Sequence, residues 1–201
     1  MVIAIDGPAG SGKSTTAKAV AAALGLRHLD TGAMYRAVAL RSVELGIEPA
    51  EAAATLSFDP GPPLLVDGKE PGTRLRDPDV SAAALRVASD ADVRQALVVR
   101  QQSILAEGDW VAEGRDICSV VAPNAEVRVW LFADERERAR RRAAELGIDV
   151  EQVLEDQRIR DGNDSGHGRS TLESPEGAVK LDTTGLSVEE VVAQISSLAG
   201  R

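Results

Sequence analysis

The chain has 201 residues, of which 43% are hydrophobic, 2% aromatic and 27% charged, a composition that fits one compact globular domain with its own core. Its net charge of -9 argues against general nucleic-acid binding, because phosphate backbones would be repelled. We find no signal-peptide pattern, no membrane-length apolar run and a single cysteine, Cys118, so we expect a cytoplasmic protein without membrane segments, disulfides or a zinc site.

The first predicted unit is a strand, a loop and a helix. Residues 2–5 form a short apolar run that indicates a buried strand, and a glycine-rich loop follows it. From Ser14 the pattern is helical, with an apolar stripe that ends at Gly25. A second short strand is expected at residues 27–30, and a second helix from Ala33 to Leu45.

The rest of the chain continues this alternation of strands and helices. Three further strands are predicted, at residues 110–113, 127–132 and 179–182. The last helix should begin at Ser187, since Glu190 three residues later completes a capping box. Alternation of this kind predicts an α/β fold, with a five-stranded parallel sheet flanked by helices.

Two segments break the alternation. Residues 58–76 are rich in Pro and Gly and contain Leu64-Leu65-Val66-Asp67-Gly68, which predicts a small hairpin in an insertion. Between residues 150 and 178, a charged helix runs into a polar, glycine-rich stretch that is too polar to be core. We interpret this second segment as a mobile lid.

The glycine-rich loop matches the phosphate-binding pattern G-x-x-x-x-G-K-[ST] in full, between a predicted strand and a predicted helix. Glycines let successive backbone N–H groups point at an anion, and the helix adds the positive end of its dipole. Lys13 would bridge the β- and γ-phosphates, and Ser14 would place its hydroxyl on Mg²⁺. We therefore expect ATP to bind at Gly7, Pro8, Ala9, Gly10, Ser11, Gly12, Lys13, Ser14 and Thr15.

Such a loop occurs in kinases, GTPases, motors and sensors, so other residues must separate them. We find no Asn/Thr-Lys-x-Asp segment of the kind that reads guanine. The third strand ends in Glu113-Gly114-Arg115-Asp116 rather than in the adjacent acids of a motor. An arginine beside a carboxylate at the carboxyl end of a sheet lies where open α/β folds bind their ligands.

These features together resemble the bacterial cytidylate kinases, nucleoside monophosphate kinases of the P-loop kinase fold, over nearly the whole chain. The matching segments are Ile5-Asp6-Gly7-Pro8 with the phosphate loop, Leu29-Asp30-Thr31-Gly32-Ala33-Met34-Tyr35-Arg36, Glu113-Gly114-Arg115-Asp116, Arg138-Ala139-Arg140-Arg141-Arg142, Arg160-Asp161, Asp164-Ser165 and Leu181-Asp182-Thr183-Thr184. The resemblance implies one kinase domain over residues 1–201, with a nucleoside-monophosphate-binding insertion at about 58–88 and a lid at about 147–170.

The resemblance also implies the activity and its residues: transfer of the γ-phosphoryl group of ATP, with Mg²⁺, to CMP or dCMP. The catalytic cations would be Lys13, Arg36, Arg115 and Arg160. CMP would be bound by eight residues: Thr31, Tyr35, Arg36, Arg100, Arg115, Asp116, Arg160 and Asp164. Among these, Arg36 and Arg115 would hold the phosphate, and Arg100 and Asp116 would read the cytosine edge.

The chemistry of CMP agrees with this set of residues. Cytosine offers acceptors at O2 and N3 and a donor at N4, which an arginine and an aspartate complement. The acceptor phosphate, with a second pKa near ~6, is largely dianionic at neutral pH and needs no general base. Catalysis then consists of positioning and charge cancellation, for which we expect Arg140 or Arg142 to face the site as well.

The chain departs from the family at three places. His167 stands where an arginine is usual in the lid, and we expect Arg169 to replace it; Leu85 and Cys118 stand where Ser and Gly are common. Two rivals stay open: a kinase of the same architecture for UMP, AMP, shikimate or gluconate, and a non-catalytic ATP sensor. We expect a monomer, with ATP and CMP or dCMP as its partners.

Overall fold

The computed structural model describes residues 1–61, 64–166 and 173–200, and the side chains of Glu145 and of residues 160–166 lie outside this description. The chain forms two compact units. Unit 1 comprises Met1–Leu26 and Trp110–Arg201, and unit 2 comprises Arg27–Asp109. The predicted insertion at 58–88 falls within unit 2 and the predicted lid at 147–170 within unit 1.

The main sheet has five strands in the order β2-β5-β1-β6-β7. Their bounds are β1 Val2–Asp6, β2 Arg27–Asp30, β5 Trp110–Gly114, β6 Val127–Phe132 and β7 Val179–Asp182. Strand β1 pairs in parallel with β5 and with β6, and β6 pairs in parallel with β7. The predicted α/β fold with a five-stranded parallel sheet flanked by helices is therefore confirmed.

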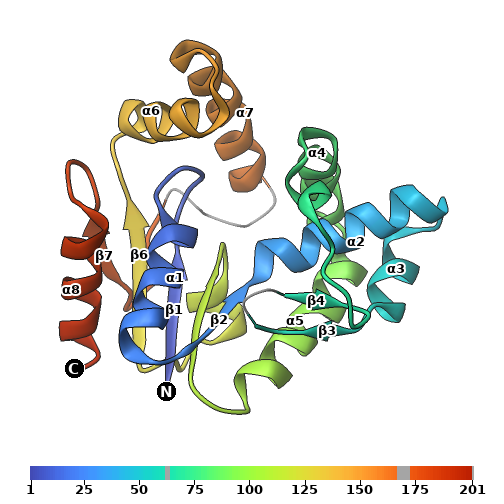
Figure 1. The fold of residues 1–201 in the computed structure, drawn as a ribbon, viewed down its shortest axis with the longest axis horizontal. Coiled ribbons are helices and arrows are strands. Elements are labelled where there is room, and N and C mark those ends of the chain that lie inside the picture. Colours follow the sequence, from blue (N-terminus) through green and yellow to red (C-terminus); the bar gives the residue numbers. More distant parts are fainter. Residues whose placement is uncertain (62–63, 167–172, 201) are drawn as a thin grey trace. The chain divides into compact units, whose positions relative to one another are not determined.

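Two helices of unit 1, α1 (Lys13–Leu24) and α8 (Val188–Leu198), lie side by side on one face of this sheet (Figure 1). Because side chains alternate along a strand, the odd-numbered residues of β1, β5, β6 and β7 face these helices. The resulting core contains Ile3, Ile5, Ala17, Val20, Ala21, Val111, Val127, Val129, Leu131, Leu181, Val191 and Ile195. Aliphatic packing of this kind fixes the carboxyl ends of the strands relative to α1.

The ends of three helices follow the signals in the sequence. Gly25 and Gly46, both in the left-handed conformation, end α1 and α2. Ser187 caps α8: its Oγ accepts from Glu190 N at 3.2 Å, and Glu190 Oε2 accepts from Ser187 N at 2.8 Å. The predicted capping box is therefore confirmed.

Helices α6 (Glu135–Leu146) and α7 (Val150–Gly166) pack against each other in unit 1 (Figure 1). Their contact is a small apolar cluster of Ala139, Ala143, Val153 and Leu154. The charged helix predicted before the lid is α7, and it continues through Gly162 to Gly166 instead of ending at the polar stretch.

Unit 2 is mainly helical. Its elements after β2 are α2 Thr31–Leu45, α3 Pro49–Thr55, β3 Phe58–Asp59, β4 Leu65–Val66, a 3₁₀ turn at Thr73–Arg76, α4 Pro78–Val87 and α5 Ala91–Leu105. Helix α2 packs on α3 and α4, and α3 packs on α5. No helix in the described residues of either unit is both long and apolar enough to cross a membrane.

The predicted hairpin of the insertion is present. Strands β3 and β4 pair antiparallel, and Val66 bridges to Lys69 around a turn in which Asp67 and Gly68 both have positive φ. The Asp67 carboxylate accepts from Ser57 N at 2.8 Å and pairs with Arg41. The hydrogen bonds from Ser57 and Arg41 hold the pKa of Asp67 below its usual value.

Candidate functional site

The loop between β1 and α1 has the backbone that its glycines permit. Gly7, Gly10 and Gly12 all have positive φ, at 153°, 74° and 89°. At Gly7 a Cβ atom would lie 2.1 Å from the carbonyl oxygen of Leu131, so a larger residue has no room. Only glycine lets β1 turn this closely beside β6, and the loop then curls at the carboxyl end of the sheet.

The first turn of α1 faces the same loop. Gly12 is the N-cap of the helix, and Lys13 and Ser14 are its first residues. Their backbone N–H groups belong to the four that a helix cannot satisfy internally, which makes this turn suited to an anion. Lys13 Nζ donates to Pro8 O at 2.7 Å, so the ammonium lies over the loop.

Ser14 meets a buried carboxylate from the neighbouring strand. Its Oγ donates to Glu113 Oε2 at 2.7 Å, and Glu113 is only 3% exposed. Glu113 reaches this position because β5 pairs with β1 in a register that sets Glu113 opposite Ile5. We assigned no role to Glu113 from the sequence, although its place at the end of a strand beside Arg115 was a usable signal.

A hydroxyl beside a carboxylate suits Mg²⁺, which prefers oxygen ligands and keeps several waters. The described residues contain no group of three or more His, Cys, Asp or Glu side chains that could hold an ion alone. The Ser14–Glu113 pair therefore fits a cation that takes most of its ligands from phosphate and water. This pair differs from a metal site that is built entirely from protein ligands.

The turn after β5 carries Arg115 and Asp116 and is held by Asp6. Asp6 is 1% exposed, and its carboxylate accepts from Ile117 N at 2.9 Å and from Cys118 N at 2.8 Å. Burial raises the pKa of Asp6, and these two hydrogen bonds offset part of that rise. Arg115 Nη1 donates to Gly7 O at 2.7 Å, so this arginine touches the loop.

Cys118 lies in the π-helical turn Ile117–Val121 that Asp6 holds. It is a free thiol with no exposed surface, and burial raises its pKa far above the usual range. Such a thiol stays protonated and is a poor nucleophile. Cys118 therefore acts as a small buried residue of the fold.

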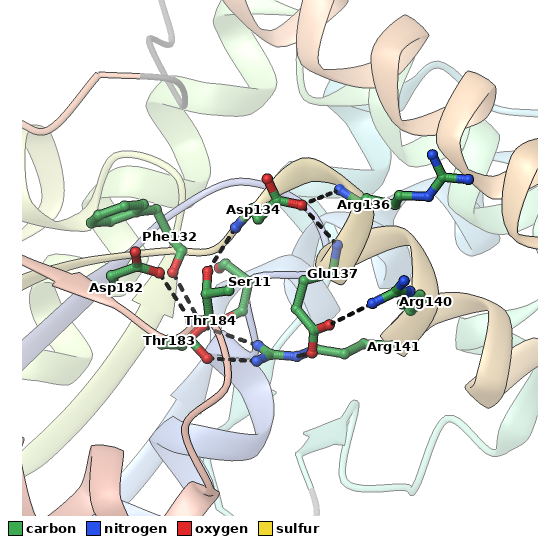
Figure 2. Close-up of polar contacts among 10 residues, drawn as sticks. All are labelled: Ser11, Phe132, Asp134, Arg136, Glu137, Arg140, Arg141, Asp182, Thr183 and Thr184. Carbon is green, nitrogen blue, oxygen red and sulfur yellow. Dashed lines mark hydrogen bonds and ion pairs between the residues drawn. The ribbon is translucent and has the colours of Figure 1, made fainter.

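Two arginines of α6 reach the loop region, and Figure 2 shows the polar network around one of them. Arg138 is 5% exposed and donates from Nη1 to Ala9 O at 2.9 Å. Arg141 donates to Thr183 Oγ1 at 3.0 Å, to Thr183 O at 2.6 Å and to Glu137 at 3.1 Å (Figure 2). Thr183 Oγ1 lies 3.3 Å from Ser11 O, which joins α6, the end of β7 and the loop.

Arg140 or Arg142 was expected to face the site from this helix, and Arg140 is the more exposed alternative. The side chain of Arg140 is 66% exposed, and its ion pair with Glu137 is long, at 4.0 Å (Figure 2). Ala139 and Ala143 of α6 pack on α7, and Arg138 and Arg141 contact the loop region from other positions around the helix.

In unit 2, the predicted acceptor residues cluster at the start of α2. Asp30 caps this helix by accepting from Ala33 N at 2.8 Å and pairs with Arg36 at 3.0 Å. Thr31 is 4% exposed, and Tyr35 and Arg36 are half-buried. Within the described residues, the buried Nε of Arg36 has no hydrogen-bond partner.

Arg100 extends from α5 to the end of α3. It donates from Nη2 to Ala54 O at 3.0 Å and from Nη1 to Leu56 O, and its guanidinium carbon lies 5.9 Å from the ring centre of Phe58. These contacts satisfy the C-terminal carbonyls of α3. The predicted role of Arg100 in reading cytosine stays a prediction.

Several predicted residues lie outside what the structure describes. These are the side chains of Arg160 and Asp164, and His167 and Arg169. In unit 1 the structure does bring together the loop residues Gly7 to Thr15 with Arg115 and Asp116. Thr31, Tyr35, Arg36 and Arg100 belong to unit 2.

Comparison with known proteins gives consistent sequence matches. The family model described as cytidylate kinase matches residues 3–201. A cytidylate kinase of Cutibacterium acnes is 43% identical, with 98% of this chain and 95% of that protein covered. One of Carboxydothermus hydrogenoformans is 42% identical, with 100% and 98% covered.

Solved structures share the fold at low sequence identity. A gluconokinase from Sinorhizobium meliloti superposes with a TM-score of 0.56 at 21% identity, over 99% of this chain and 91% of that one. A shikimate kinase from Acinetobacter baumannii, in complex with shikimate, gives 0.52 at 14% identity, over 98% and 92%. At these identities the likeness concerns the fold alone.

Proposed function

Because the chain belongs to the cytidylate kinase family, we propose that it transfers the γ-phosphoryl group of ATP to CMP or dCMP. The observation that carries this proposal is the loop with its cations. Lys13, Arg115 and Arg138 donate to the carbonyl oxygens of Pro8, Gly7 and Ala9, respectively. Each of these hydrogen bonds places a cation at the loop.

We propose that ATP binds with its phosphates in this loop, at Gly7 to Thr15. Backbone N–H groups at the start of α1 would face the phosphates, and Lys13 would move from Pro8 O to the β- and γ-phosphates. Phosphoryl transfer needs positioning and cancellation of charge, with little covalent work by the protein. Fixed guanidinium groups near the loop supply both.

We propose Mg²⁺ as the cation that accompanies ATP, held on the protein side by Ser14 with Glu113 behind it. When bound, this ion would neutralise charge on the phosphate oxygens. The residues Ser14 and Glu113 orient one another through their 2.7 Å hydrogen bond. Their contribution is to fix where the ion sits, at the carboxyl end of β5.

The acceptor contacts stay proposals at the level of single residues. Arg36 and Arg115 would bind the CMP phosphate; Arg100 and Asp116 would bind the cytosine edge; Thr31 and Tyr35 would line the pocket; and Arg160 and Asp164 would face the ribose and phosphates. Arg36 is half-buried, and its Nε lacks a hydrogen-bond partner among the described residues, which supports its assignment to the CMP phosphate. Asp116 follows Arg115 directly, in the turn that Asp6 holds.

A coupled assay of ADP release tests the proposal. CMP, dCMP, UMP, AMP, shikimate and gluconate are supplied in turn with MgATP, and CMP or dCMP should be preferred at least tenfold in kcat/KM. Preference for another acceptor would refute the cytosine contacts of Arg100 and Asp116. Tight ATP binding with no acceptor-dependent ADP release would instead indicate a sensor.

We further propose a monomer that works in the cytoplasm and binds no nucleic acid. The net charge of -9 argues against nucleic-acid binding, and the single cysteine of the sequence fits a reducing compartment. Light scattering after gel filtration at several concentrations tests the oligomeric state.

A further inference from the structure

Gln157 is a buried polar residue that the interpretation above leaves without a role. It lies on α7, is 3% exposed, and neither Nε2 nor Oε1 of its amide has a hydrogen-bond partner in the part of the chain that the structure describes. The apolar neighbours Val153 and Leu154 on the same helix pack against α6. A buried amide without a partner costs free energy, so it is rare unless something else completes it.

The amide of Gln157 ends at the phosphate loop. A Cβ atom built on Gly10 would lie 2.8 Å from Gln157 Nε2 and 3.0 Å from Arg138 O. Gly10 has a φ of 74°, so the loop already adopts a conformation that favours glycine there. Helices α6 and α7 thus bring one backbone carbonyl and one side-chain amide against the middle of the loop.

A second orphaned polar atom lies in the same loop. The hydroxyl of Ser11, which is 0% exposed, also lacks a partner among the described residues. Ser11 is the residue after Gly10, and both lie one turn before α1. Two buried polar groups without partners, beside a helix start that favours anions, indicate a ligand that supplies acceptor oxygens.

We propose that Gln157 is a nucleotide-binding residue, whose side-chain amide donates to a phosphate oxygen of ATP held in the loop. The proposal rests on the proposed binding of ATP at Gly7 to Thr15. It gives α7 a direct contact with the donor nucleotide in addition to the packing of α7 on α6. A purely structural glutamine would instead find its partners within the protein or in a buried water.

The variant Gln157→Leu tests this assignment, because leucine has a similar size and cannot hydrogen-bond. Titration calorimetry with MgATP in the absence of CMP should give a dissociation constant at least about tenfold above wild type, since hydrogen bonds to charged groups are the stronger ones. The affinity for CMP should stay within about twofold. Without nucleotide, the thermal midpoint of Gln157→Leu should equal or exceed that of wild type, because an unpartnered amide is removed.

Gln152→Leu is the matched control, since Gln152 lies on the same helix with an exposed side chain. It should leave the affinity for ATP unchanged. If Gln157→Leu does not fold, Gln157→Met and Gln157→Glu take its place; the carboxylate should weaken ATP binding further by repelling phosphate.

Two outcomes would overturn the proposal. The first is an ATP affinity of Gln157→Leu within twofold of wild type, as a water-satisfied amide predicts. The second is a lowered thermal midpoint with unchanged ATP affinity, which would assign the amide to the fold. If wild type itself fails to bind ATP, the proposed function fails, and that result is separate from either outcome.

Discussion

Among the glycines with a positive φ, replacement of Gly7 by alanine should destabilise the protein the most. The new Cβ would lie 2.1 Å from Leu131 O and 2.9 Å from Ser11 Oγ. The first contact is with backbone of the central sheet, so about 1 Å of movement is needed and no side-chain rotation can supply it. Both β6 and the loop would have to shift.

Two costs add at this position. Overpacking of a fixed site costs about 1 to 3 kcal/mol. A non-glycine residue at a φ of 153° adds roughly 1 to 3 kcal/mol of backbone strain. Gly7→Ala should therefore lose about 2 to 6 kcal/mol of unfolding free energy, measured by urea denaturation, with ATP affinity lost as well because Arg115 is anchored on Gly7 O.

Gly25→Ala is the matched control. Gly25 ends α1 at a φ of 67°, and a Cβ there would have nothing within 4 Å. Only the cost of the left-handed conformation applies, about 1 to 2 kcal/mol. If Gly7→Ala proved no less stable than Gly25→Ala, the close approach of the loop to β6 would not be a constraint on this sequence.

Three further outcomes follow from the site. Ser14→Ala should lower kcat by roughly 10²-fold and raise the Mg²⁺ concentration needed for half-maximal rate, and it should lower thermal stability modestly because the buried Glu113 carboxylate loses a hydrogen-bond donor; an unaltered Mg²⁺ dependence would contradict the metal assignment. Arg138→Met should lower kcat/KM for ATP at least about tenfold whereas the exposed Arg140→Met should not, and equal effects would refute the orientation of α6. The pKa of Asp6 is raised above its ordinary value of 3.8, so the folded state binds the Asp6 proton more tightly than the unfolded state does. The stability of wild type relative to Asp6→Asn should therefore fall as pH rises from 3.8 through the folded pKa. Urea unfolding of both proteins between pH 5 and 8 tests this, and a stability difference that grew in favour of wild type would contradict it.

Local patterns were enough for most of the fold. The apolar runs and glycine stops predicted five strands and the ends of α1 and α2, because these signals act within a few residues. Helix α3 was not predicted from the sequence. It begins at Pro49, where a proline at the first position loses no hydrogen bond. Its seven residues are too few for a periodic pattern to stand out.

The residues that support the site were harder to find than those that form the loop. Glu113 meets Ser14 99 positions away, and Asp6 holds the N–H groups of Ile117 and Cys118 more than 110 positions away. These contacts depend on the register of β1 with β5, which no local pattern encodes. The same holds for α6: the sequence favoured Arg140 or Arg142, and the contacts of Arg138 and Arg141 with the loop region depend on how the helix packs in the fold.

Buried polar atoms without a partner indicate where a ligand contributes hydrogen bonds to this fold. At the start of α8, Ser187 and Glu190 satisfy each other, as do most polar groups at the ends of helices. Beside the loop, Ser11 and Gln157 are buried without partners in the described residues. A ligand that supplies the missing acceptors relieves that cost only in the folded state, so ATP should raise the thermal midpoint of wild type by more than that of Gln157→Leu at equal concentration. The free energy that these buried groups cost without a partner is then recovered as affinity for the donor nucleotide.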